Sequence, residues 1–247
     1  MSHLTVSKIL EDPFSALSLS EMLKILAALG WSTNYLAMAH RTHADNLPAI
    51  AVLPLCCDIA WEFTYAWIYP QASGHWQGVV RVWFFLHTAV LAATLRYAQN
   101  DWAGTPLGKS RARLVLLYVA VIGAFAAGQL CLALEMGGAL GFHWGGALCQ
   151  FLSSSGAVGQ LLTRGHTRGA SLVIWGARAI STAGGFVKLC IRFQHQVDGA
   201  PWLDSPMCWF YIGIVLSLDA SYPVLYQLTR RHEEASGRGN SGKVKSR

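Results

Sequence analysis

The sequence contains little charge for its length of 247 residues. Asp, Glu, Lys and Arg make up 13% of it, whereas such residues make up roughly 25% of a soluble domain. Hydrophobic residues account for 53%, and the mean hydropathy is +0.35. This composition argues against a soluble domain and predicts a membrane protein that is embedded in a lipid bilayer.

Several common sequence signals are also missing. The six cysteines and nine histidines lack the paired spacing of a zinc site or a disulfide scaffold, so we expect the cysteines to pack and predict no metal and no cofactor. Residues up to Ser20 lack the charged, apolar and small-residue order of a cleavable signal peptide. We find no internal repeat and no loop long enough for a soluble domain. Because no cleavable signal peptide is expected, membrane insertion is expected to start at the first helix.

Seven apolar stretches are long enough to cross a bilayer. A membrane helix needs about 20 mostly apolar residues, because each residue adds about 1.5 Å across a hydrocarbon layer of about 30 Å. The sequence therefore predicts an all-α, polytopic membrane protein, a bundle of seven transmembrane helices. We expect one domain over residues 1–232 and a disordered, basic tail over residues 233–247. The predicted spans are residues 20–40, 47–69, 79–98, 114–135, 139–162, 170–190 and 208–228.

The basic residues divide unequally between the two sides of this topology. Thirteen of the nineteen fall on one side, five fall on the other, and Arg178 lies within the sixth span. The positive-inside rule then predicts a cytosolic C-terminus and a lumenal N-terminus. Because membrane topology accounts for the net charge of +6, no nucleic-acid partner is expected. The thirteen are Arg41, Arg96, Lys109, Arg111, Arg113, Arg164, Arg168 and the six from Arg230 to Arg247.

Four carboxylic acids fall within or beside the predicted spans. An acid at the centre of a membrane helix costs about 2.5–3.5 kcal/mol on insertion scales, so such residues are candidates for function. Asp58 and Glu62 are four residues apart and share one helix face with Tyr65. Asp219 lies in the last span, whereas Glu135 adjoins the predicted helix end at Met136 and is expected to reach water. Asp58, Glu62 and Asp219 are therefore expected to point into the bundle.

Two interpretations of these acids stay open at this point. The acids could pair with Arg178, or accept hydrogen bonds, and so tie helices together. Alternatively, because burial disfavours the charged form, a buried carboxyl could hold a proton and act as a Brønsted acid. Aromatic rings would then stabilise cations electrostatically, although each ring taken singly also suits packing. The aromatic residues on the acid-bearing helices and beside Arg178 are Trp61, Tyr65, Trp67, Trp175, Tyr222 and Tyr226.

Four sequence blocks resemble one known family. They are GWSTNYLAM at residues 30–38, LPLCCDIAWEF at 53–63, RGHTRGAS at 164–171 and SLDASY at 217–222. The blocks are similar to those of the small fungal integral-membrane terpene cyclases of meroterpenoid and indole-diterpene pathways. The resemblance covers about residues 28–230 and follows the same order of seven helices.

The resemblance implies an activity and a substrate class. Enzymes of this family take a hydrophobic prenylated aromatic or polyketide substrate with a terminal epoxide, protonate the epoxide and let the cation pass through successive rings. They require no metal or diphosphate, in agreement with the lack of an Asp-rich DDxxD motif here. The implied localisation is the endoplasmic-reticulum membrane, and the implied class is an isomerase-type cyclase. The oligomeric state is not indicated.

The resemblance also assigns residues. The essential acids of the family match Glu62 and Asp219, and we expect them to face a shared cavity near the middle of the membrane. Glu62, alone or coupled to Asp219, is then expected to donate the proton. Asp58 is a departure, because many relatives are expected to carry Asn there, and it could share the proton of Glu62. The other expected pocket and cation-stabilising residues are Asp58, Trp61, Tyr65, Arg178, Tyr222 and Tyr226.

Two other classes of protein compete with this hypothesis. A proton-coupled transporter would also use intramembrane acids, but many such transporters show internal repeats, which we do not find here. A heptahelical receptor or retinal protein is suggested by the helix count alone. The retinal protein is disfavoured because residues 208–228 contain no lysine for a Schiff base.

Overall fold

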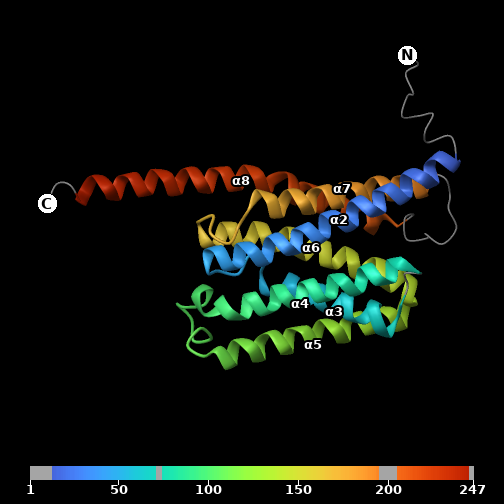
Figure 1. The fold of residues 1–247 in the computed structure, drawn as a ribbon, viewed down its shortest axis with the longest axis horizontal. Helices are drawn as coiled ribbons and strands as arrows, with labels where there is room; N and C mark the ends of the chain where they lie inside the picture. Colours follow the sequence, from blue (N-terminus) through green and yellow to red (C-terminus); the bar gives the residue numbers. More distant parts are fainter. Residues whose placement is uncertain (1–12, 71–73, 195–204, 245–247) are drawn as a thin grey trace, which may run out of the picture.

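The computed structural model describes residues 13–70, 74–194 and 205–244, and all its regular structure there is helical. The helices lie side by side along the long axis of the molecule (Figure 1). They are α2 (Pro13–Asp45), α3 (Val52–Phe63), the π-helix η1 (Thr64–Ile68), α4 (His75–Asp101), α5 (Arg111–Met136), α6 (Gly138–Arg164), α7 (Leu172–Gln194) and α8 (Pro206–Val244).

Every predicted span falls on a helix, so the all-α prediction is confirmed. The second span begins later than expected, at Val52 in place of residue 47. Asn46 adopts a left-handed backbone with φ of 53° and Pro48 follows closely, and both features favour a turn over a helix. The same span also changes from α-helix to π-helix after Phe63, which alternation of polar and apolar residues does not reveal.

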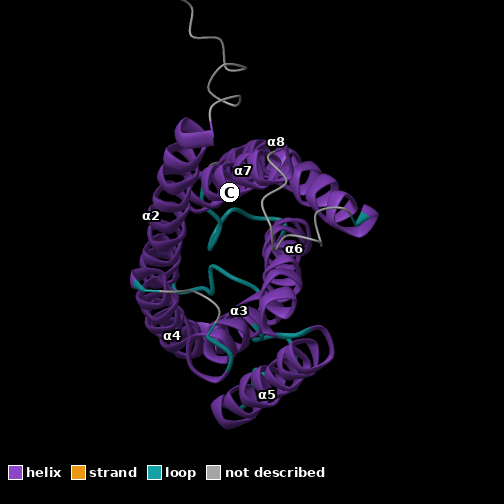
Figure 2. Cartoon of the chain, turned by 90° about the vertical axis from the view of Figure 1, so that its right-hand side faces the viewer, coloured by secondary structure: helices purple, strands orange, loops and turns teal. Residues whose placement is uncertain are grey.

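Six of the helices form a ring when the bundle is viewed along its length (Figure 2). Neighbours around this ring are α2, α4, α3, α6, α8 and α7, and α7 closes it by packing on α2. Helix α5 lies outside the ring against α3 and α6. The side chains that point toward the centre therefore come from helices that are far apart in the sequence.

Three helical segments are long and apolar enough to cross a membrane: Trp76–Asp101, Arg111–Met136 and Pro206–Ser236. The other described helices do not meet the same requirement of length and composition. Helices α2, α3 and α7 carry buried polar side chains such as Asn34, Asp58 and Arg178, which lower their hydropathy. The structure thus supports a membrane protein with three such segments, and seven crossings remain a prediction.

One end of the bundle gathers the basic connections between helices. Arg164 at the end of α6 forms a two-point ion pair with Asp101 at the end of α4, with distances of 2.9 and 2.7 Å. Asp45 at the end of α2 accepts a hydrogen bond from the backbone N–H of Gly169 at 2.5 Å. Several residues that the charge count assigned to one side therefore do lie together.

The C-terminal tail differs from the expectation. Helix α8 continues to Val244, so residues 233–244 are helical where we expected disorder, and residues 245–247 lie outside the described part. Arg230 and Glu234 form an ion pair of 3.2 Å one turn apart, and Thr167 donates a hydrogen bond of 2.6 Å to Glu233. Such pairs one helical turn apart favour continuation of a helix into water.

Candidate active site

Asp58 and Glu62 lie one turn apart on α3 and are both buried. A histidine of α4, His87, lies between them. Its Nδ1 is 2.8 Å from Oε1 of Glu62, and its Nε2 is 3.6 Å from Oδ2 of Asp58. The first distance is a hydrogen bond and the second is too long for one. The three side chains, named the acid cluster below, bring together two carboxyls and one imidazole.

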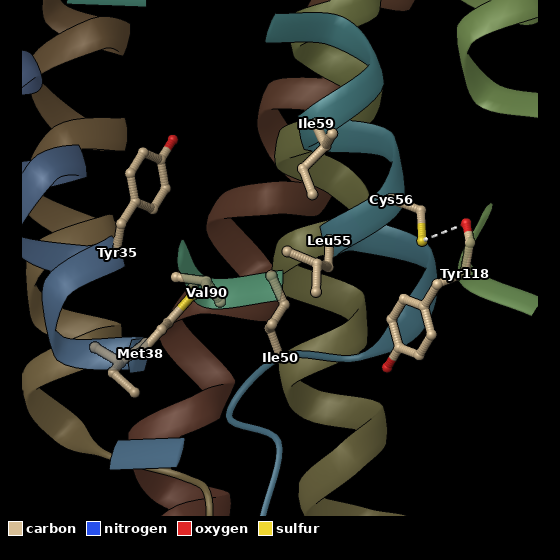
Figure 3. Close-up of a cluster of buried hydrophobic side chains, with 9 residues drawn as sticks. Tyr35, Met38, Ile50, Leu55, Cys56, Ile59, Val90 and Tyr118 are labelled. Atoms are coloured by element: carbon tan, nitrogen blue, oxygen red, sulfur yellow. Dashed lines mark hydrogen bonds between the residues drawn. The ribbon is translucent and has the colours of Figure 1, made fainter. Parts of the chain in front are cut away.

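Helix α2 fixes this cluster from the side opposite α3. The ring of Tyr35 packs on the ring of His87 with centroids 3.8 Å apart. Asn34 donates a hydrogen bond of 2.7 Å to the carbonyl of Ile174 and so ties α2 to α7. Tyr35, Leu55 and Val90 belong to a core of buried apolar side chains that joins α2, α3 and α4 (Figure 3). The acid cluster is therefore held by well-packed neighbours.

Asp58 and Glu62 line a cavity of about 190 Å³. A larger cavity of about 330 Å³ adjoins it and shares five of its lining residues. The two volumes together lie in the range of about 300–1,000 Å³ that is usual for small-molecule sites. The shared residues are Trp31, Trp61, Trp83, Gly146 and Gln150. Two carboxyls therefore lie at one end of an aromatic-walled cavity. We call the smaller part, which Asp58 and Glu62 line, the acid cavity.

Trp61 owes its place to a glycine on the facing helix. Its indole N–H donates a hydrogen bond of 2.9 Å to the carbonyl of Phe142. A Cβ at Gly145 of α6 would overlap the Trp61 and Gln129 side chains, so only glycine allows this close approach. The indole is therefore held between α3 and α6, where it lines both cavities.

The expected cavity shared by Glu62 and Asp219 is not what the structure shows. Asp219 of α8 does not line the acid cavity. It pairs with the buried Arg178 of α7, with Nη2 of the arginine 2.7 Å from Oδ1. This is the pairing that we considered as an alternative role for the acids. The reason is geometric: α7 lies beside α8 in the ring (Figure 2), so Arg178 is close enough to pair with Asp219.

One serine connects the two acidic sites. The carbonyl of Ser153 on α6 accepts a hydrogen bond of 3.3 Å from Arg178, and its hydroxyl donates one of 3.2 Å to Oδ2 of Asp58. Among the described residues, hydrogen bonds therefore connect Asp219 to the acid cluster through Arg178 and Ser153. The carbonyl of Asp219 also accepts a hydrogen bond of 2.7 Å from the indole of Trp175.

The expected tyrosines lie away from the acid cavity. Tyr65 is fully buried but falls in η1, and its ring packs edge-on against Phe142 at 5.4 Å. Its ring also lies 5.9 Å from that of Trp61, so Tyr65 packs behind the indole that lines the cavity. Tyr222 and Tyr226 pack in a separate apolar cluster with Leu161. Of the predicted aromatic residues of the site, only Trp61 lines the acid cavity.

Sequence reasoning missed four residues of this region: Trp31, Tyr35, Trp83 and His87. The first two lie in the block at residues 30–38 that carried the family resemblance. A signal for His87 existed, because it is a titratable residue in the middle of an apolar span at 79–98, where ionisable side chains are rare. Among the described residues, no three or more His, Cys, Asp and Glu side chains are arranged to hold a metal ion.

An apolar helical bundle that encloses buried carboxyls at the end of an aromatic cavity defines a membrane protein with an internal acid site. Comparison with known proteins identifies its family: the chain belongs to the Pyr4-like transmembrane terpene cyclases, whose family model matches residues 7–232. The resemblance noted from the four sequence blocks is thereby confirmed.

Individual relatives support this membership. The chain is 99% identical over 247 residues to terpene cyclase ausL of Aspergillus calidoustus, with all of both chains aligned. It is 65% identical over 230 residues to terpene cyclase ausL of Penicillium brasilianum, which covers 93% of each chain. It is 38% identical over 210 residues to terpene cyclase pyr4 of Aspergillus fumigatus, which covers 85% of this chain and 86% of that one. No solved structure matches.

Proposed function

We propose that this protein is a membrane-bound terpene cyclase that protonates the terminal epoxide of a prenylated substrate and drives its cationic cyclisation. One observation carries the proposal: the Glu62 carboxyl lies at the inner end of an apolar, aromatic-walled cavity. Its Oε1 contacts His87, whereas its buried Oε2 has no hydrogen-bond partner among the described residues. An acid in this position is available to a bound substrate.

The proton transfer starts the reaction. The apolar wall accepts the prenyl chain with its epoxide toward Glu62 and excludes water, which strengthens interactions with the acid. Glu62 gives its proton to the epoxide oxygen, the adjacent C–O bond breaks, and a hydroxyl group and a carbon cation result. Each alkene then adds to the cation in turn, until a C–H bond loses its proton to a base and an alkene forms.

The indole walls serve the cationic stage. Trp31, Trp61 and Trp83 all line the acid cavity, and the face of an indole attracts a cation by its quadrupole. Because they surround the inner end, they stabilise charge close to the carbon where it first forms. Their shape also decides how the prenyl chain folds before protonation, so they contribute to product selection.

Asp219 is assigned a positioning role in this proposal. A guanidinium stays charged and makes its strongest hydrogen bonds with an ionised carboxylate. Arg178 and Asp219 are therefore suited to hold α7 and α8 together, and to fix Ser153 beside Asp58, without contact with the substrate. Glu62 is then the proton donor, and Asp219 supports the donor at a distance.

The membrane location and the topology of the enzyme belong to the same hypothesis. We place it in the endoplasmic-reticulum membrane, with seven crossings, a lumenal N-terminus and a cytosolic C-terminus, and with residues 1–232 as one cyclase domain. The gathering of Arg164, Arg168 and the end of α2 at one end of the bundle supports this orientation. Glycosylation acceptor sites engineered at each terminus test it: only the N-terminal site is expected to be glycosylated.

A substrate comparison tests the reaction itself. The chain is expressed in a yeast host together with prenylation and epoxidation enzymes, and the products are identified by mass spectrometry and NMR. The epoxide is expected to give cyclised products with the mass of the substrate, whereas the unepoxidised prenyl compound is expected to remain linear. Equal cyclisation of both compounds would contradict epoxide protonation as the first step.

A further inference from the structure

One face of α6 lines the larger cavity over two helical turns. The residues on this face are His143, Gly146, Ala147 and Gln150, whose spacing places them on the same side of a helix. Gly146 and Gln150 also line the acid cavity, whereas His143 does not. Because each helical residue adds about 1.5 Å, His143 lies about 10 Å from Gln150 along the helix. His143 therefore marks the outer part of the larger cavity.

Small residues leave room between these two ends. Gly146 and Ala147 occupy the middle of the α6 face, and a Cβ at Gly146 would lie 3.5 Å from the ring of Trp61. Gly185 of α7 also lines the larger cavity, and a Cβ there would meet no atom within 4 Å. A folded chain that starts in the acid cavity can therefore extend along α6 as far as His143.

The proposed reaction moves positive charge in this direction. Glu62 opens the epoxide in the acid cavity, and each ring closure leaves the cation on a carbon that is farther from the epoxide along the prenyl chain. The last cation therefore forms nearer to the larger cavity than the first. A base that ends the reaction is needed there, and its separation from Glu62 keeps it from taking the proton of the acid beforehand.

His143 has the chemistry that such a base needs. Among the described residues that line the larger cavity, none is Asp or Glu. The ammonium of Lys188 has no acceptor, and the thiol of Cys208 and the phenol of Tyr211 are weak proton acceptors in their neutral forms. A neutral imidazole accepts a proton at physiological pH. Of the titratable groups along this cavity, His143 is thus the best suited to take a proton from carbon.

We propose that His143 is the base that ends the cyclisation. The inference rests on the proposed function, since it assumes a cation that Glu62 generates. A ring nitrogen of His143 takes the proton of a C–H bond beside the final cation, the electron pair of that bond forms the alkene, and the imidazole becomes an imidazolium. His143 is then a catalytic residue, and the point at which it meets the chain determines which alkene forms.

Product release restores both groups. The emptied larger cavity of about 330 Å³ has room for water, which the carboxyls and Gln150 can hold by hydrogen bonds. His143 is half-buried, in the second turn of α6. The imidazolium gives its proton to this water, and the carboxylate of Glu62 takes one from it, so no net proton is consumed. Because loss of a proton to water can leave either tautomer, each turnover starts from the same state.

Two substitutions of equal length separate basicity from shape. His143→Gln removes the base, and His143→Glu replaces it with a carboxylate. Each variant is purified in detergent and mixed with a prenylated epoxide that the unaltered chain cyclises. In His143→Gln the epoxide is expected to disappear at nearly the normal rate, because Glu62 is intact. The share of the normal alkene is expected to fall at least about tenfold, since a general base contributes about 100-fold or more.

The fate of the trapped cation supplies a second readout. In His143→Gln, cyclised alcohols with the mass of the substrate plus one water, or isomeric alkenes, are expected in place of the normal alkene. Water labelled with heavy oxygen marks the alcohols in the mass spectrum, and NMR shows that they contain rings. His143→Glu is expected to regain most of the normal alkene, because its carboxylate can take the proton.

A matched control uses a histidine outside the cavity. His40 is exposed near the end of α2, and His40→Gln is expected to give the normal alkene alone. Size-exclusion chromatography checks that each variant is folded. If His143→Gln fails to fold, His143→Asn carries the same prediction, because it also replaces the imidazole by an amide without basicity.

The outcomes distinguish the proposal from the function on which it rests. The normal alkene in its usual share from His143→Gln would overturn the terminal base. The same altered products from His143→Gln and His143→Glu would overturn it as well, because shape and not basicity would then decide. Equal loss of epoxide consumption in both variants would also contradict it, since it indicates a structural role. The proposed function itself fails if Glu62→Gln consumes the epoxide as fast as the unaltered chain.

Discussion

The bundle contains two buried acidic sites whose partners differ. In the acid cluster, Glu62 faces an imidazole, a group that can be neutral or charged. Across the ring, Asp219 faces the guanidinium of Arg178, a group that stays charged. The partner of Glu62 can therefore accept or give up a proton, whereas the partner of Asp219 cannot. The comparison teaches that the partner of a membrane-embedded acid, more than its burial, decides what it can do.

The largest expected effect comes from the acid that faces the cavity. Glu62→Gln removes the ionisable proton but keeps an amide that can hydrogen-bond to His87, so the fold is expected to survive. Cyclisation of the epoxide is expected to fall by about 100- to 10,000-fold, the usual contribution of a general acid. Product formation in microsomes measures it. Glu135→Gln is the control, because Glu135 is exposed at the end of α5, and comparable losses in both variants would remove the special status of Glu62.

The ion pair is expected to respond in stability first. Asp219→Asn leaves the buried Arg178 without its carboxylate, and breaking such a pair costs about 3–5 kcal/mol. Thermal unfolding in detergent measures the loss. The double variant Arg178→Met with Asp219→Leu removes both charges, and it is expected to regain most of the stability and to cyclise more than Asp219→Asn does. A double variant that is stable but less active than Asp219→Asn would assign Asp219 a direct chemical role. It would contradict the view that Asp219, unlike Glu62, only holds helices in place.

A smaller effect is expected where the two sites meet. Ser153→Ala removes the hydroxyl that donates to Asp58 at 3.2 Å while the backbone carbonyl that accepts from Arg178 remains. A hydrogen bond to a carboxylate contributes about 1.5–3 kcal/mol, so we expect turnover to fall by about tenfold and the stability to fall by less than in Asp219→Asn. Steady-state turnover measures this. Ser155→Ala, whose hydroxyl bonds only to its own helix, is expected to behave like the unaltered chain.

The smallest effect is expected in the product ratio. Trp61→Leu removes an indole from the wall of the acid cavity, and a cation–π contact contributes about 0.5–2 kcal/mol. The share of early-terminated products is therefore expected to rise by several-fold, as measured by gas chromatography with mass spectrometry. Trp67 lies six residues later and is 40% exposed, so Trp67→Leu is expected to leave the ratio unchanged. A shift of similar size in both variants would indicate a general loosening of the bundle.

The sequence alone identified the two acidic residues Glu62 and Asp219, but it did not predict that their partners differ. Glu62 and Asp219 stood out because a carboxyl in an apolar span is costly, and that cost can be read from composition alone. Which partner each acid meets depends on how α4, α7 and α8 are placed around the ring, and spacing within one helix carries no such information. Arg178 could be considered as a partner because it lies alone within a span, but its choice of Asp219 required the fold.

The helices were predictable and the fine register was not. Runs of about 20 apolar residues gave each helix, since length and hydropathy are local properties. The π-helical turn at Thr64–Ile68 was not predicted, because its carbonyls are satisfied by Gln77 of α4, a contact between two helices. His87 was overlooked for the same reason: its role is visible only when α3 and α4 stand side by side.

The π-helical turn also determines which parts of the chain could be exchanged between relatives. Its freed carbonyls at Tyr65 and Ala66 accept hydrogen bonds of 3.1 and 2.7 Å from the side-chain amide of Gln77 on α4, and the same helix supplies His87 to the carboxyls of α3. Helices α3 and α4 therefore depend on each other and can be exchanged between relatives only together. A chimera that receives α3 alone would lose both partners, whereas transfer of the continuous segment 52–101 would carry the acids, their histidine and the turn together.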